Sequence, residues 1–186
     1  ETRFDAGVEA ALFMAALAHA GGDRVDLLTL DQHIRARSSS EQPGHLLHRI
    51  ATDVAPVFPR LLAADWTQLP PEVASITRQR ALLVLVTPLD SAAVEEGLIP
   101  VLPMLTAKHV VLIAAVADPE LDTIAQRRDT TEHTFLAASA AAQQLRNQQL
   151  VQLFQQFGVE VVQASPTLLP TAIGDAYLRL KTAGRL

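Results

Sequence analysis

The sequence predicts an α/β protein with a doubly wound, mainly parallel sheet and helices on both faces of that sheet. Two continuous aliphatic runs of strand length, 81–86 and 109–116, are typical of strands buried on both faces of a parallel sheet. Patterns of helical spacing separate the strand-like runs, and this alternation favours βαβ crossover connections. No internal repeat or low-complexity linker divides the chain, so we expect residues 1–186 to form a single domain.

The N-terminal part is predicted to contain a helix, a hairpin and a second helix. Apolar residues recur at helical spacing from Phe4 to Ala18, and the glycine pair that follows supplies a stop. The half-alternating stretch 24–30 predicts a strand, and the alternating stretch 33–37 predicts its partner across a tight turn. After a polar loop, 45–54 has the pattern of a helix that ends before the next prolines.

The middle of the chain holds the two aliphatic runs. A helix is expected to open at Pro70-Pro71 and to run towards Arg80, because proline suits the first turn of a helix. The strand 81–86 follows it directly. A second helix is expected over 91–105, interrupted or kinked at its prolines, before the strand 109–116.

The C-terminal part begins with a long stretch rich in Ala, Gln and Leu. It predicts one helix over 130–157 that stops at Gly158, followed by a short strand at 159–163 and a last helix at 170–180. Apolar residues on one side of the long helix predict core packing, with a docking face for another protein as the alternative. These residues are Leu136, Ala140, Leu145, Leu150, Leu153 and Phe157.

Composition excludes several classes of protein. With 49% hydrophobic and 19% charged residues, the chain is not wholly disordered. The net charge of −5 argues against a nucleic-acid partner, since a phosphate-binding face needs surplus Lys and Arg. The absence of Cys removes disulfides, thiolate nucleophiles and cysteine-ligated metals. No apolar stretch approaches the roughly 18–20 residues of a membrane span, so this segment itself is expected to make no membrane contact.

The motifs that mark common enzymes are missing. The chain has no G-x-G-x-x-G after a strand, no G-x-x-x-x-G-K-[ST] and no G-x-S-x-G. We therefore expect a protein that is not an enzyme.

Carboxylates and a hydroxyl follow the predicted strands, where ligands bind in open α/β sheets. Asp31 follows the first strand, Thr87 and Asp90 the next, and Asp118 the one after. Such oxygens could hold Mg²⁺, and a metal-dependent hydrolase using Asp31, Asp90 and Asp118 is the alternative function. The structural interpretation is that Asp90 caps the following helix and Asp118 makes a turn.

Three other signals have plain structural interpretations. His45 and His48 lie three apart on a predicted helix, but no further ligand at helical spacing completes a metal site, so a polar helix face is expected. His109 starts a strand. Trp66, the single tryptophan, is expected to be a packing anchor.

Six motifs together resemble a known family in their order and spacing. The motifs are Arg3 to Ala10, Gly22 to Leu28, Thr87 to Asp90, Lys108 to Ile113, Ala117 to Leu121, and Tyr177 to Lys181. In these motifs the chain resembles the C-terminal part of the DUF58 family, whose soluble region is like a von Willebrand factor A (vWA) domain, and the resemblance covers nearly the whole chain.

The resemblance implies a Rossmann-like, vWA-like sheet and a binding or chaperone-like role with a MoxR-type AAA+ ATPase. It also implies a membrane-anchored parent protein of bacterial origin, with this segment on the cytoplasmic side of the membrane. A protein-interaction module is thus the leading functional hypothesis. The metal-dependent hydrolase described above is the second, and a purely structural domain is the third.

The resemblance also implies a metal-ion-dependent adhesion site, which departs from the family pattern here. Its first motif, Asp-x-Ser-x-Ser, does not occur in residues 1–186, and the later Thr-Asp reads Thr87-Pro88, with Asp90 as a displaced substitute. Thr67 is taken as the hydroxyl that the middle loop contributes to such a site. We expect an incomplete site and no cofactor in this chain, with Mg²⁺ left to a full-length protein.

The same resemblance places the central first strand of the sheet before Glu1. Its absence would leave two neighbouring strands with unpaired backbone groups. We expect the gap to be closed in one of three ways: by direct pairing of the two strands, by an exchanged segment, or by a second copy of the chain in a homodimer.

Overall fold

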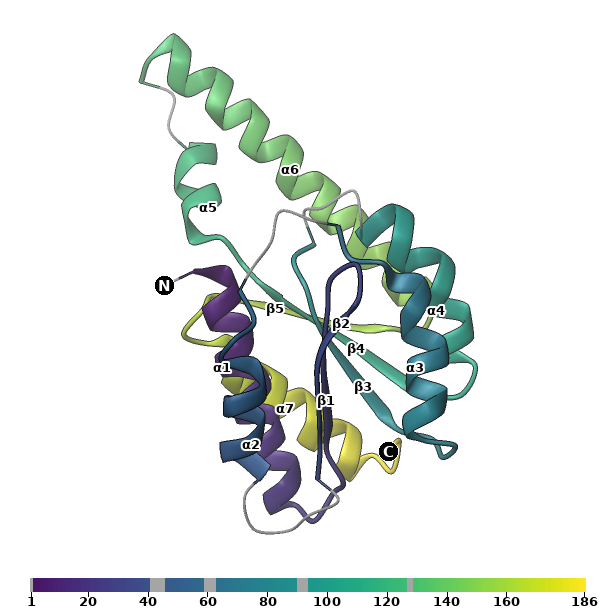
Figure 1. Ribbon diagram of the computed structural model, residues 1–186. Coiled ribbons are helices and arrows are strands. Elements are labelled where there is room, and N and C mark those ends of the chain that lie inside the picture. Colours follow the sequence, from purple (N-terminus) through teal and green to yellow (C-terminus); the bar gives the residue numbers. More distant parts are fainter. Residues whose placement is uncertain (1, 41–45, 59–62, 90–93, 127–128) are drawn as a thin grey trace.

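The structure, a computed structural model, is an α/β fold in which helices flank strands on two sides (Figure 1). It describes residues 2–40, 46–58, 63–89, 94–126 and 129–186. The strands are β1 (Asp26–Leu30), β2 (Ile34–Ser39), β3 (Leu82–Val86), β4 (Val110–Val116) and β5 (Glu160–Ala164). The helices are α1 (Arg3–Ala20), α2 (Leu46–Val54), α3 (Leu69–Ile76), α4 (Ile99–Thr106), α5 (Pro119–Gln126), α6 (Thr131–Gln156) and α7 (Leu169–Thr182), with the short turns η1 (Trp66–Gln68) and η2 (Val94–Leu98).

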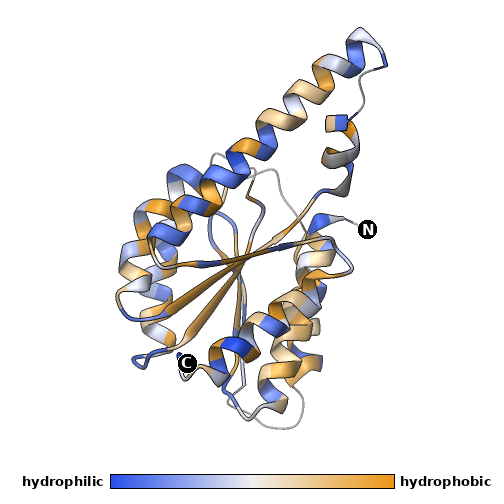
Figure 2. Cartoon of the chain, turned by 180° about the vertical axis from the view of Figure 1, so that it is seen from behind, coloured by the Kyte–Doolittle hydropathy of each residue, from blue (hydrophilic) through white to orange (hydrophobic). Residues whose placement is uncertain are grey.

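Strands β3, β4 and β5 form a parallel sheet in that order. Six of the seven residues of β4 are buried, because β4 lies between two strands and both of its faces are covered. Alternate side chains pack into two clusters, since successive residues of a strand point to opposite faces. Leu112 and Ala114 meet α1 and α7, whereas Val111 and Ile113 meet α3, α4 and α6. Figure 2 shows the apolar strands at the centre between the helices.

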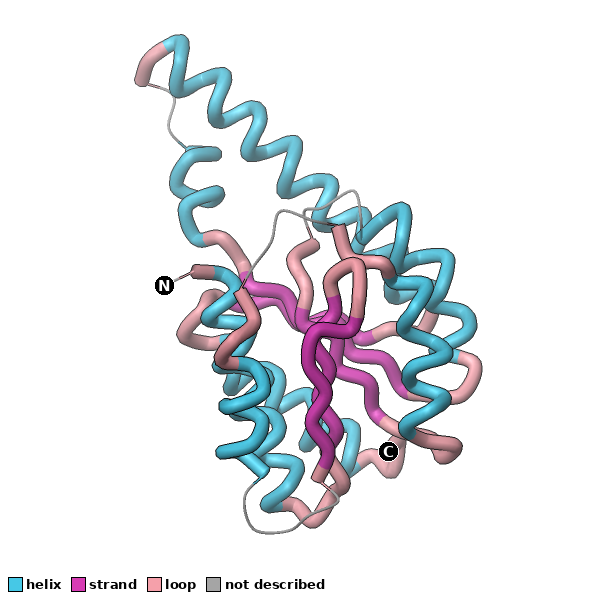
Figure 3. Tube along the Cα trace, in the orientation of Figure 1, coloured by secondary structure: helices cyan, strands magenta, loops and turns pink. Residues whose placement is uncertain are grey.

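The hairpin of β1 and β2 forms a separate antiparallel sheet, with a shift in register between Thr29 and Leu30. In Figure 3 the hairpin crosses in front of the three parallel strands. Helix α2 packs its buried face, including Leu46 and Ile50, against Ala15 of α1. The described residues therefore form two sheets, and direct pairing of β1 with β3, one of the three expected ways to close the gap, does not occur among them.

The predicted order of strands and helices is confirmed, with four differences. Helix α3 ends at Ile76 rather than near Arg80, because Thr77 is already extended on the way into β3. Pro103 lies inside α4 without ending it, and its neighbours Leu102 and Leu105 are fully packed.

Helix α5 was not predicted, because its eight residues are of mixed polarity and directly follow the turn at Asp118. Strand β3, predicted to be buried on both faces, is only half-buried, because in the part of the chain that the structure describes it has one neighbouring strand, β4.

No helix within the described ranges combines the length and the hydropathy needed to cross a bilayer.

Candidate functional site

The carboxyl ends of β3 and β4 lie next to each other, as the sequence pattern predicted. The Thr87 N–H donates to the carbonyl oxygen of Ala114 at 3.0 Å, so the residues that follow the two strands start from one edge. Thr87 is buried, and its hydroxyl donates to the neighbouring Pro88 carbonyl at 3.5 Å. Asp90, the central residue of the predicted site, lies outside the described residues.

Asp118 makes a turn and an ion pair at this edge. Its Oδ1 accepts a hydrogen bond from the Glu120 N–H at 2.9 Å, which supports the predicted turn and leads into α5. Its Oδ2 accepts from Arg3 Nη2 at 2.6 Å. The hydrogen bond from Arg3, opposed in part by burial, lowers the pKa of Asp118 below its usual value. Asp118 therefore ties the start of α5 to the start of α1, across 115 positions of sequence.

Thr67 has a local role. It is exposed, and both its N–H and its hydroxyl donate to Asp65 Oδ1, at 3.1 and 2.6 Å. These hydrogen bonds, together with one from Gln68, lower the pKa of Asp65. Asp65 thus caps the short 3-10 helix η1, and the Thr67 hydroxyl donates a hydrogen bond to the capping carboxylate.

Asp31 stabilises the turn of the hairpin. Its Oδ1 accepts from the His33 N–H at 3.0 Å, its Oδ2 lies 3.8 Å from Arg35 Nε, and its carbonyl accepts from the Asp65 N–H at 2.9 Å. The structure therefore brings Asp31 next to the segment that carries Thr67.

With Asp90 outside the described residues, the predicted metal site of Asp90, Thr87 and Thr67 stays a prediction. No hydrogen bond or shared partner joins Thr67 to Thr87 among the residues placed in the structure. In the same part of the chain, no three His, Asp or Glu side chains group in a way that could hold a metal ion. The hydrolase interpretation, which depends on Asp31, Asp90 and Asp118, stays a prediction without support from their geometry.

A polar cluster that sequence reasoning missed joins the end of α1 to α7. Asp23 Oδ2 accepts hydrogen bonds from the Tyr177 hydroxyl at 2.5 Å and from Lys181 Nζ at 2.8 Å. Lys181 also donates to the Tyr177 hydroxyl at 2.9 Å and to the Gly21 carbonyl at 3.1 Å. The contacts to Asp23 span 154 and 158 positions of sequence, so they clamp the end of α1 to α7.

The cluster shifts the pKa values of all three groups. Burial alone would raise the pKa of Asp23, but the hydrogen bonds from Lys181 and Tyr177 outweigh burial and lower it. Burial, followed by the hydrogen bond to Asp23, raises the pKa of Tyr177. The hydrogen bond to Asp23 raises the pKa of Lys181. The arrangement holds Asp23 ionised and the tyrosine protonated, which suits a structural clamp.

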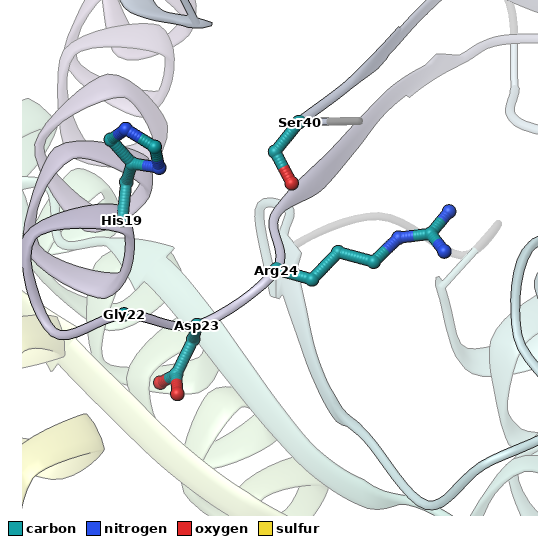
Figure 4. Close-up of a pocket in the computed structure, with 5 residues that line it drawn as sticks. All are labelled: His19, Gly22, Asp23, Arg24 and Ser40. Carbon is teal, nitrogen blue, oxygen red and sulfur yellow. The ribbon is translucent and has the colours of Figure 1, made fainter. Parts of the chain in front are cut away.

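An open surface pocket of about 370 Å³ lies beside the clamp, lined by His19, Gly22, Asp23, Arg24 and Ser40. Figure 4 shows that the Asp23 carboxylate points away from the side chains of Arg24 and Ser40. The Asp23 carboxylate, which lines the pocket, is therefore already hydrogen-bonded to Tyr177 and Lys181 of α7.

One local signal of the clamp was visible in the sequence. Tyr177 lies on the predicted helix 170–180 and Lys181 directly follows it, four residues on, and residues at this spacing are neighbours where the helix continues. Their joint partner Asp23 could not be found, because no pattern links residues so far apart along the chain. All three lie in motifs that carry the resemblance to the DUF58 family.

The apolar side of α6 divides into two parts. Leu150 and Phe154, near its C-terminal end, are buried against the parallel sheet. Leu136 and Leu145, which the sequence pattern placed on a core-facing side, are instead 49% and 55% exposed, and the adjacent Phe135 is 72% exposed. The first half of α6 packs on α5, and Figure 1 shows both extending away from the sheet. We refer to α5 and the first half of α6, residues 119–126 and 131–145, as the arm.

His109 is buried and directly precedes β4, so it leads into the strand. Its ring Nδ1 is enclosed and has no hydrogen-bond partner among the residues that the structure describes. Burial, with a smaller effect from the charge of Lys108, lowers the pKa of His109 below its usual 6.5.

The lowered pKa of His109 predicts a loss of stability in acid. Because the unfolded chain takes up a proton on this histidine at a higher pH than the folded chain, the stabilisation present above pH 6.5 declines as the pH falls below it. We expect His109→Leu to reduce this decline, measured by urea unfolding at pH 7.5, 6.0 and 5.0. Equal pH dependence in the variant and the original protein would contradict the assignment.

No protein-family model, curated protein or solved structure matches this chain.

Proposed function

We propose that this chain is a non-enzymatic protein-interaction module of the DUF58 type that acts with a MoxR-type AAA+ ATPase on the cytoplasmic side of a membrane. The exposed apolar surface of the arm supports a docking role. The choice of an AAA+ ATPase as partner rests on the resemblance of the sequence motifs.

The arm has the properties of a docking surface. Phe135 and Leu136 are consecutive, exposed residues near the N-terminal end of α6, where this helix packs on α5. Over its 26 residues, α6 carries only two charged side chains, Glu132 and Arg146. A partner would therefore desolvate little charge on α6, and aromatic residues in such positions commonly dominate binding.

Binding to a purified MoxR-type AAA+ ATPase tests the proposal. The chain, immobilised for biolayer interferometry, is titrated with the ATPase without nucleotide, with ADP and with a non-hydrolysable ATP analogue. We expect binding in at least one nucleotide state. The double variant Phe135→Ser with Leu136→Ser should weaken that binding about tenfold or more, since aromatic anchors contribute about 1–2 kcal/mol or more each.

A matched control uses an apolar residue outside the arm. Leu168 is 61% exposed just before α7, and Leu168→Ser should leave the affinity unchanged. Failure of the unmodified chain to bind in every nucleotide state would contradict the proposed partner. Equal affinity of the arm variant and the original chain would contradict the arm as the site.

A further inference from the structure

The first half of α6 carries a stripe of exposed residues along one side. Its four members are three, four and three positions apart, which is the heptad spacing of helices that pack along one another. They are Phe135, Ala138, Ala142 and Leu145. The buried residues Ala137 and Ala140 lie towards the other side of the helix, on the half where α5 packs. In the part of the chain that the structure describes, the stripe therefore stays uncovered.

The stripe has the same size pattern when it is read in either direction. Large side chains, Phe135 and Leu145, stand at its two ends, and the two alanines lie between them. When two copies of α6 run in opposite directions, Phe135 meets Leu145 of the second copy and Ala138 meets Ala142. The alanines let the two helix axes approach to about 8 Å, the short end of the usual range. A surface that is complementary to itself in this way is what a two-fold dimer requires.

The charges of α6 favour the antiparallel arrangement. Glu132 and Arg146 are exposed and are the only charged side chains of this helix. They are two heptads apart, so they flank the same edge of the stripe and lie about 21 Å from each other along the axis. Antiparallel pairing places Glu132 beside Arg146 of the second copy, and Arg146 beside its Glu132. Parallel pairing would instead bring equal charges to the same height.

Both charges are available for such contacts. Among the residues that the structure describes, neither Glu132 nor Arg146 forms an ion pair. Arg146 donates one hydrogen bond to the uncharged Gln143 side chain, at 3.2 Å. Two reciprocal ion pairs would thus use every charge on α6. Opposite charges placed in this way fix the partner and the direction of packing more than they add affinity.

The rest of the molecule leaves room for this pairing. The first half of α6 extends away from the sheet (Figure 1), whereas Leu150 and Phe154 hold the other end of the helix against it. With Ala138 placed against Ala142 of the second copy, residues 131–149 of the two helices overlap. The two parallel sheets then lie beyond opposite ends of the helix pair. Contact between the helices therefore does not require the two sheets to approach each other.

We propose that the arm binds a second copy of this chain, with the two α6 helices packed antiparallel through the stripe Phe135, Ala138, Ala142 and Leu145 and joined by two Glu132–Arg146 ion pairs. The contact covers two heptads and is smaller than the roughly 1,200–2,000 Å² interface of a stable complex, so we expect a dissociation constant of about 10–100 μM. The dimer uses the same arm as the proposed ATPase contact but does not depend on the ATPase.

Sedimentation of the chain alone tests for the dimer. Between about 1 and 500 μM, which spans the expected dissociation constant, the mass should rise from 20.1 kDa towards twice that value. Ala142→Glu places a charge at the centre of the stripe and should weaken association about tenfold or more. Leu136→Glu is the matched control, because Leu136 is exposed next to Phe135 but lies off the stripe, and it should leave association unchanged. Circular dichroism checks that both variants keep their helix content.

Charge reversal tests the antiparallel arrangement. Glu132→Arg and Arg146→Glu each turn both ion pairs into like-charge pairs, so each variant alone should associate about five- to tenfold more weakly. An equimolar mixture of the two variants should recover the original affinity, because every pair in the mixed dimer again joins opposite charges. A variant that is merely misfolded would not be rescued by mixing.

Three outcomes would overturn the proposal. The first is a chain that stays at 20.1 kDa up to about 500 μM. The second is equal association of Ala142→Glu and the original chain, which would place a dimer contact elsewhere. The third is a mixture of the charge variants that associates no better than either variant alone. Since no ATPase is present, each of these results leaves the test of the ATPase contact unaffected, and failure of the ATPase to bind leaves the dimer unaffected.

Discussion

Phe154→Ala is expected to lower the free energy of unfolding by about 3–5 kcal/mol, the usual cost of removing a fully buried aromatic side chain. Phe154 is completely buried and belongs to the cluster formed by α3, α4 and one face of β4. Phe154 lies near the C-terminal end of α6, where this helix packs on the sheet, so the variant should also weaken the packing of α6 on the sheet. Urea denaturation followed by circular dichroism measures the change.

The control lies on the same helix. Phe135 is 72% exposed, so Phe135→Ala should change the free energy of unfolding by no more than about 0.5 kcal/mol. The two substitutions remove the same atoms, and only burial differs between them. A loss at Phe135 comparable to that at Phe154 would show that the arm packs against more of the protein than α5.

Tyr177→Phe is expected to cost about 1.5–3 kcal/mol, the range for a hydrogen bond to a charged group. The substitution keeps the ring in the core and removes only the hydroxyl, which donates to Asp23 at 2.5 Å and is buried with its side chain. Asp23 would then rely on Lys181, and that ion pair is partly exposed and screened by solvent. Thr182→Val, which removes an exposed hydroxyl from the same helix, should have an effect within about 0.5 kcal/mol.

The cost of Tyr177→Phe should depend on pH. The pKa of Asp23 is lowered in the folded chain from its ordinary 3.8, so the stabilisation from its ionised form is present above pH 3.8 and is lost as the pH falls through the folded value. The difference between the variant and the original protein should therefore shrink in acid. Unfolding measured at pH 6 and at the lowest pH at which the chain stays folded tests this, and a constant difference would contradict the role of Asp23.

Local sequence patterns were sufficient to predict most of the helices and strands. The aliphatic run of β4 and the long helix α6 were predicted closely, because each is longer than its alternatives and is bounded by clear stop signals such as Gly158, which has a φ of 75°. Helix α5 was missed because eight residues of mixed polarity carry little periodic signal.

The candidate site depended far less on local pattern. The sequence placed Thr87 and Asp118 at the ends of neighbouring strands, and this is where they lie. It could not indicate that Asp118 would pair with Arg3, or that Thr67 would serve a cap at Asp65. These partners are set by how helices and turns pack, which no spacing encodes.

By itself the sequence determined the α/β class, the aliphatic strands and the order of the helices, because hydrophobic periodicity and turn residues act over a few positions. Only the tertiary structure decided which apolar residues meet a partner. It buried Phe154 and exposed Phe135 on one helix, and it joined Asp23 to Tyr177 across the chain. Burial and strand pairing are properties of elements brought together in space, and their free energy depends on contacts that the local pattern does not contain.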